Sequence, residues 1–158
     1  MSSFSLGIRG GDVEERTRQR LIGGPDRQVV WRSGEQSVLL RRDLVRVRLL
    51  RGWLVVGIDL TTTQTGRCPL QLVYFLGDDQ RGDGATAAVR INAGTPDATA
   101  LAEIWGADLQ RVVWDAVLDA VQAALVRATN VAKGQPVTLR GFRAADGALQ
   151  VDIVTGAL

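Results

Sequence analysis

The sequence contains no histidine and a single cysteine, Cys68. A disulfide within the chain is therefore impossible, and a zinc site built from histidine and cysteine is excluded. The Ser-His-Asp and Cys-His arrangements of nucleophilic catalysis are excluded for the same reason. All five serines precede residue 38, and none lies in a Gly-x-Ser-x-Gly motif. This leaves the carboxylates for acid–base chemistry.

Long apolar runs are also missing. The longest contain about half a dozen residues, whereas a membrane-spanning helix needs about 20. The first residues lack the apolar segment of a signal peptide, and no phosphate-binding glycine motif opens a predicted helix. We therefore expect a cytoplasmic protein with no membrane span and with no nucleotide, metal or other cofactor.

Charge is abundant but unevenly placed. The sequence has eighteen arginines and one lysine, and its formal net charge at pH 7 is +2. Residues 1–67 carry twelve arginines against seven acidic residues (+5), whereas residues 68–158 carry seven basic against ten acidic residues (−3). These two parts can pair within one chain or between copies, because the arginine guanidinium binds carboxylates through two hydrogen bonds.

A chain of 158 residues is most simply one domain. We predict an N-terminal arm over residues 1–27 and a single domain over residues 28–158. Within the arm, residues 12–22 could form a short helix, with Asp12 as its N-cap and Glu15 closing a capping box.

Short apolar runs predict two hairpins after the arm. The first covers residues 28–40 with a turn at Ser33-Gly34, which places Arg32 opposite Glu35. The second turns at Arg51-Gly52. Strand alternation then sets a core face and an opposite face. The core face consists of Val45, Val47, Leu49, Leu54, Val56 and Ile58, and the opposite face of Arg46, Arg48, Leu50, Trp53, Val55 and Gly57.

The rest of the chain predicts strands around one long helix. Residues 70–77 read as a strand buried on both faces, and residues 85–92 as its hairpin partner. Thr95 and Pro96 start a helix that runs to about Asn130, with a kink or break expected at Gly106. A final hairpin turns at Asp146-Gly147. This order predicts an α+β fold, an antiparallel sheet packed against a long or broken helix.

The helix carries an apolar stripe and, outside it, Trp114 and Leu118. A helix that is apolar on much of its circumference has more than one packing surface. This second stripe indicates either burial within the chain or a subunit contact, where tryptophan is enriched. Asp115 and Asp119 lie one turn apart and could form a carboxylate pair, receive an arginine or face water.

Two charged clusters each have two interpretations. Asp78, Asp79 and Asp83 could supply oxygen ligands for calcium, but Arg81 interrupts the ligand pattern and a solvated turn is favoured. The arginines between residues 41 and 51, with Trp53 beside them, could bind nucleic acid. A solvated or ion-paired strand face is the favoured interpretation of that cluster.

The sequence therefore predicts a non-enzymatic structural or protein-interaction subunit that associates with itself or with another subunit, within a larger bacterial or phage-type assembly. The alternative is a small ligand-binding domain or a carboxylate-based enzyme, and a basic nucleic-acid-binding module comes third. The candidate interface residues are Arg46, Arg48, Arg51, Trp53, Trp114, Leu118, Asp115 and Asp119.

Overall fold

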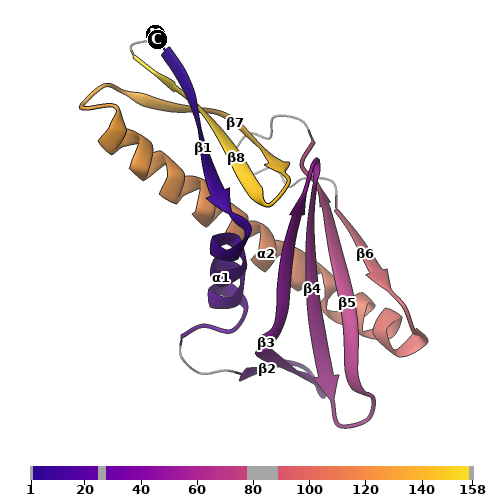
Figure 1. Cartoon of the computed structure of the whole chain (residues 1–158). Helices are drawn as coiled ribbons and strands as arrows, with labels where there is room; N and C mark the ends of the chain where they lie inside the picture. Colours follow the sequence, from indigo (N-terminus) through magenta and orange to yellow (C-terminus); the bar gives the residue numbers. More distant parts are fainter. Residues whose placement is uncertain (1, 25–27, 78–88, 157–158) are drawn as a thin grey trace.

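The computed structural model describes residues 2–24, 28–77 and 89–156. In these residues eight strands and two helices form an α+β fold (Figure 1), as the sequence predicts. The elements are β1 (Ser2–Arg9), α1 (Gly10–Leu21), β2 (Gln28–Ser33), β3 (Gln36–Leu50), β4 (Trp53–Thr62), β5 (Gly66–Phe75), β6 (Val89–Ala93), α2 (Pro96–Val131), β7 (Val137–Ala145) and β8 (Ala148–Thr155).

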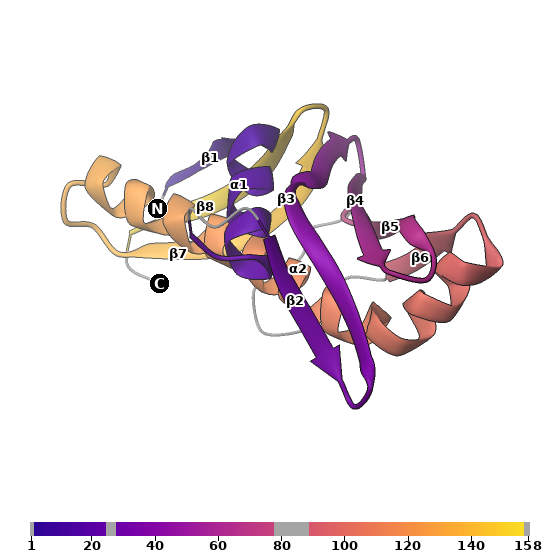
Figure 2. The same cartoon turned by 90° about the horizontal axis from the view of Figure 1, so that it is seen from below.

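The strands form two antiparallel sheets rather than one. The larger sheet has the order β2-β3-β4-β5-β6, and the smaller has the order β1-β8-β7. The long helix α2 runs across both sheets, with its first half against the larger sheet and its second half against the smaller one (Figures 1 and 2). One continuous hydrophobic core fills the space between α1, α2 and the inner faces of the sheets.

The register of the β3–β4 hairpin is the predicted one. Val45 pairs with Ile58, and Leu49 pairs with Leu54, on the core face. On the opposite face Arg48 lies beside Val55 and is exposed. The turn at residues 51–52 and the strict alternation of side chains together fix this register, because a shift of one residue would move the arginines into the core.

Helix α2 begins as predicted but does not break. The Thr95 hydroxyl accepts a hydrogen bond from the Ala98 backbone N–H at 3.1 Å, and the helix continues through Gly106 to Val131. A Cβ atom at Gly106 would lie 2.7 Å from Cδ1 of Ile91. The glycine therefore allows β6 to approach the helix closely. The break expected at this glycine is therefore wrong.

The N-terminal segment contains an element that we did not predict. Residues 2–9 form β1, which pairs along its whole length with β8. The alternation of Phe4, Leu6 and Ile8 indicates this strand. Helix α1 follows directly, with Arg9 as its N-cap residue. Asp12 therefore lies inside the first turn, and its predicted capping role is wrong. The division of the chain at residue 27 stays a prediction.

Two further local predictions differ from the structure. Arg32 pairs with Ser37 rather than with Glu35, because Gly34 takes the first position of the turn with φ of +60°. Strand β5 is buried on one face, since Gln71 and Phe75 are exposed. The C-terminal hairpin is confirmed, because Ala145 pairs with Ala148 around the predicted turn.

Helix α1 covers part of the free edge of β3. Strand β2 pairs with β3 up to Arg41. Beyond that point the side chains of α1 satisfy the backbone groups of β3. Arg18 donates two hydrogen bonds to the Val45 carbonyl at 3.2 and 2.9 Å, and the Val47 N–H donates to the Glu14 carboxylate at 2.9 Å. A helix laid along a sheet edge in this way prevents pairing with another strand.

Backbone hydrogen bonds connect the two sheets. They join the β3–β4 turn, the residue that follows β5 and the end of β7. The Gly52 N–H donates to the Ala144 carbonyl at 3.0 Å, the Ala144 N–H donates to the Leu76 carbonyl at 2.9 Å, and the Leu76 N–H donates to the Gly52 carbonyl at 2.9 Å. A second contact is made by the Gly147 N–H, which donates to the Leu49 carbonyl at 2.9 Å. We call these five residues the junction.

Within the described residues, neither helix combines the length and the apolar character that a membrane span requires.

Substitution of Gly52 tests the left-handed backbone conformation that this residue adopts in the junction. Gly52 has φ of +84°, a region in which a side chain costs about 1–2 kcal/mol. We expect Gly52→Ala to lower the free energy of unfolding in urea by that amount. Gly7→Ala is the matched control, since a Cβ at Gly7 meets open space, and should change the unfolding midpoint little. Equal midpoints for the two variants would contradict the expectation.

Candidate interaction surface

The face of the five-stranded sheet that points away from α2 carries most of the predicted interface residues from β3 and β4. Figures 1 and 2 show α2 on one side of this sheet and no other described helix or strand packed on the opposite side. We call the opposite side the outer face. Its outward residues on β3 to β6 include Arg46, Arg48, Leu50, Trp53, Val55, Gly57, Asp59, Arg67, Pro69, Gln71, Val73, Phe75, Arg90 and Asn92.

One end of the outer face is apolar and exposed. Strand pairing places Leu50, Trp53 and Phe75 in one row across β3, β4 and β5. Their exposed fractions are 39%, 44% and 37%. The Trp53 and Phe75 rings meet edge to face, with centroids 5.2 Å apart. Seven large apolar residues are exposed in the described chain, and these three plus Val30 lie on the outer side of this sheet. Exposed apolar side chains gathered in this way indicate an interaction site.

The next two rows of the outer face are basic. Arg48, Val55, Val73 and Arg90 form one row, and Arg46 begins the row beside it. All three arginines are exposed, and none of them forms an ion pair with a residue that the structure describes.

The acidic residue of this face is already paired. Asp59 receives two hydrogen bonds from Arg67, at 2.9 and 2.6 Å. The outer face of β3 to β6 is therefore a positively charged surface next to an apolar row.

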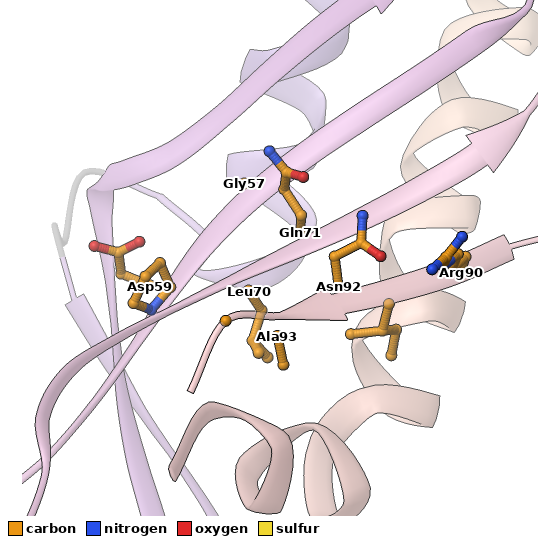
Figure 3. Close-up of a pocket in the computed structure, with 10 residues that line it drawn as sticks. Gly57, Asp59, Leu70, Gln71, Arg90, Asn92 and Ala93 are labelled. Atoms are coloured by element: carbon orange, nitrogen blue, oxygen red, sulfur yellow. The ribbon is translucent and has the colours of Figure 1, made fainter. Parts of the chain in front are cut away.

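A shallow hollow lies in the middle of the outer face. Gly57, which has no side chain, lies between Arg46 and Gln71 across the strands and is one of the residues that line the hollow. The hollow has a volume of about 600 Å³. Figure 3 shows Asp59, Gln71 and Asn92 pointing to the outer side, whereas Leu70 and Ala93 point toward α2. The rim of this hollow offers amide and charged groups to whatever covers the face.

Arg51 lies at the apolar end of the outer face, in the β3–β4 turn. Its side chain is exposed, and its backbone N–H donates to the Asp146 carboxylate at 3.0 Å. Together with Gly52, Trp53 and Phe75 it borders a cleft of about 690 Å³ between the two sheets. The structure thus brings together four predicted interface residues, Arg46, Arg48, Arg51 and Trp53.

The four predicted interface residues of α2 lie elsewhere. Trp114 is 3% exposed, and its ring lies about 6.0 Å from the rings of both Tyr74 and Phe142. Its side chain therefore has no free surface for a partner. Leu118 and Asp115 are half-buried on the same helix. None of the four lies on the outer face of the sheet.

Asp119 receives an arginine, one of the three roles that the sequence left open. The Arg20 guanidinium donates hydrogen bonds to both carboxylate oxygens, at 2.6 and 2.8 Å. These hydrogen bonds lower the pKa of Asp119 below its ordinary value of 3.8. The contact holds α1 against α2 and links the basic first part of the chain to the acidic second part.

Sequence reasoning missed several residues of the outer face, notably Phe75, Val73, Arg90 and Asn92. The apolar run of β5 predicts burial on both faces, although Gln71 in its middle indicates a strand with one solvent-exposed face. The position of β6 relative to β5 required knowledge of their pairing, which the residue pattern alone does not give.

The described residues contain no group of three or more aspartate, glutamate or cysteine side chains placed to hold a metal ion. The acidic cluster at residues 78–83 lies outside the described residues. The chain matches no known protein-family model and no curated protein in sequence. The function must therefore be argued from the surface itself.

The contact between Arg20 and Asp119 predicts a pH-dependent loss of stability. Because the folded-state pKa is lowered, the stabilisation is complete above the unfolded value of 3.8 and is lost as the pH falls through the folded value. Asp119→Asn should lower the free energy of unfolding near pH 6 by at most about 1 kcal/mol, since both side chains are partly exposed.

Urea unfolding of the wild type and Asp119→Asn between about pH 2 and pH 6 measures this difference. The difference should shrink toward zero at the acidic end. Arg20→Gln should give the same dependence, because it removes the same contact. A difference that is equal at every pH would contradict the assignment.

Proposed function

We propose that this chain is a non-enzymatic protein-interaction subunit that associates with itself through the outer face of its five-stranded sheet. The observation that carries the proposal is the exposed row of Leu50, Trp53 and Phe75 beside the exposed arginines Arg48 and Arg90. Tryptophan, phenylalanine and arginine are enriched in protein interfaces and supply much of their binding energy.

The composition of this surface supports an interface rather than a solvated sheet. A sheet with one wet face normally alternates apolar inward residues with polar outward residues. Here the outward positions of β4 and β5 include Trp53, Val55, Val73 and Phe75. Burying these side chains in an interface would contribute about 25 cal/mol of favourable free energy for each Å² of apolar surface removed from water. Helix α1 covers the part of the β3 edge that β2 leaves unpaired, so that stretch is closed to another strand.

A second candidate is a small polar ligand in the hollow above Gly57. The amides of Gln71 and Asn92 and the guanidinium of Arg90 could hydrogen-bond to it. The hollow supports binding better than acid–base catalysis, because its carboxylate, Asp59, is held by Arg67.

Nucleic acid is the third candidate. Single strands bind where basic side chains lie beside aromatic rings on which bases stack. On the outer face Trp53 and Phe75 pack edge to face against each other, so the face of one ring is occupied by its neighbour. The charge division and the lack of catalytic motifs support the first proposal, a self-associating structural subunit. A cytoplasmic subunit of a bacterial or phage-type assembly would fit this proposal, and no residue motif identifies that assembly.

Solution mass at low and high salt tests the proposal. If arginines contribute to the contact, the assembled fraction should fall between about 0.05 and 0.5 M salt, because screening shortens the range of exposed charges. Arg48→Glu should give a monomer at low salt with an unchanged melting temperature. Arg140→Glu is the control, since this exposed arginine lies on β7 of the other sheet. A monomeric wild type at low salt would overturn the proposal.

A second pair of variants separates association from folding. Trp53→Ala should weaken association by at least about tenfold, the loss expected for an aromatic anchor at an interface, and should lower the melting temperature little. Val47→Asp should instead lower the melting temperature strongly, because it places a carboxylate at a half-buried position of the core face whose backbone N–H is bound to the Glu14 carboxylate. Melting temperature and assembled fraction measured on both variants test this. If Trp53→Ala lowers the melting temperature as much as Val47→Asp does, the outer position of Trp53 is wrong.

A further inference from the structure

We propose that the occupant of the outer face is the first half of α2 from a second copy of this chain, so that copies associate head to tail. This inference rests on the proposed function and names its partner. Two different surfaces of one chain would then meet, the outer face of the sheet and the exposed side of the helix.

The exposed side of the first half of α2 is acidic. We call it the helix stripe, and its members are Asp97, Ala100, Glu103, Ile104, Ala107, Asp108 and Arg111. The helix stripe has three carboxylates and one guanidinium. The Arg111 guanidinium lies 3.4 Å from the Asp108 carboxylate. Ile104, 42% exposed, stands among them.

The outer face and the helix stripe are complementary in charge and in apolarity. On the outer face, Arg46, Arg48 and Arg90 form no ion pair with a described residue. On the helix stripe, the same is true of Asp97 and Glu103. Ile104 gives the stripe an apolar side chain to set against the row of Leu50, Trp53 and Phe75. Complementary potentials of this kind steer encounter and fix register at an interface.

The small side chains of the stripe allow a close approach. Ala100 and Ala107 lie on either side of Ile104 along the helix, so that a sheet could pack near the helix backbone. The stripe covers residues 97–111, about 22 Å of helix at about 1.5 Å per residue. Strand β4, with ten residues, is about 33 Å long at about 3.3 Å per residue, and so can accommodate the stripe along its length.

The position of the two surfaces determines the type of assembly. The outer face and the helix stripe lie on opposite sides of the same sheet-and-helix layers (Figure 2). A copy that uses one surface therefore leaves the other free, and the contact can repeat. Each five-stranded sheet inside the assembly would then have a helix on both faces. Head-to-tail contacts of this kind form rings or open filaments rather than closed two-fold dimers.

A second copy explains the division of charge better than a different acidic partner does. The basic surface is formed chiefly by β3, in the basic first part of the chain, and the acidic surface by α2, in the acidic second part. When copies meet head to tail, the positive charge of the first part of the chain and the negative charge of the second part both contribute to the contact. A different partner would leave the acidic stripe without a role.

Two variants that block one surface each provide the test. The sheet variant carries Arg48→Ala and Trp53→Ala, and the helix variant carries Glu103→Lys and Asp108→Lys. The charge-matched control for the helix variant carries Glu35→Lys and Asp43→Lys, at exposed positions on or beside β3. The full chain is measured by light scattering and analytical ultracentrifugation at low salt, at concentrations up to about 100 μM, because one helix on one sheet is a small interface.

We expect the wild type and the control to assemble and each blocked variant alone to be monomeric. An equimolar mixture of the two blocked variants should form a dimer and stop there, because each contributes one intact surface. Circular dichroism melts should show that both variants are folded.

Each other result overturns a different statement. If the helix variant assembles like the wild type while the sheet variant does not, the occupant is not α2, but the proposed function stands. If the mixture stays monomeric, the contact is not head to tail. If the sheet variant assembles like the wild type, or if the wild type is monomeric, the proposed function itself fails.

Discussion

The fold depends on the hydrogen bonds of the junction, where the ends of the two sheets meet. Gly52, Ala144 and Leu76 exchange three backbone hydrogen bonds in a closed cycle, in which Ala144 and Leu76 are buried and would otherwise leave backbone polar groups unpaired. Unpaired buried backbone groups cost about 1–3 kcal/mol each. The cycle therefore sets the position of one sheet relative to the other, and the single core between them follows from it.

The position of the outer face follows from the junction and from the edge of β3. Strand β3 has fifteen residues, and its edge is covered successively by β2, by Glu14 and Arg18 of α1, and by Gly147 of the β7–β8 turn. The same elements that seal the edge lie beside the sheet and not over it. In the described chain, the sheet keeps one uncovered face, and its β3 edge is protected along its length. Such a sheet can add a layer without adding a strand.

The sequence predicted the fold wherever a local pattern carried enough information. The β3–β4 hairpin was predictable because a turn glycine and six apolar residues agree on one register. The break at Gly106 was predicted wrongly because a glycine in a helix has two causes, a break or a close neighbour. Its neighbour, Ile91, is distant in the sequence. The split into two sheets depends on contacts such as Gly52 with Ala144, which no local pattern reveals.

The candidate surface was predictable in part for the same reason. Alternation along β3 and β4 gave Arg46, Arg48 and Trp53, but the rest of the surface comes from strand pairing. Phe75 and Arg90 join it because β5 and β6 lie beside β4. The sequence predicts Trp114 as an interface residue because it lies outside the main apolar stripe of α2. It is buried because the chain packs more than one surface around that helix, with Tyr74 and Phe142 against its ring.

Some charged residues of the two parts of the chain are paired within the molecule, and others are left without a partner among the described residues. Among the arginines of the first part, Arg18 and Arg20 are used inside the molecule, on the β3 edge and on Asp119. Among the acids of the second part, Asp146 and Asp152 are likewise engaged, with the Arg51 backbone and with Arg143. Among the residues without an ion pair in the described chain, Arg46, Arg48 and Arg90 lie together on the outer face, and Asp97 and Glu103 lie together on the helix stripe. Others, such as Arg140 and Glu35, are exposed elsewhere. A molecule that needed charge for solubility alone would intersperse both signs over its surface, so the separation of the two surfaces is itself an argument for contact between copies.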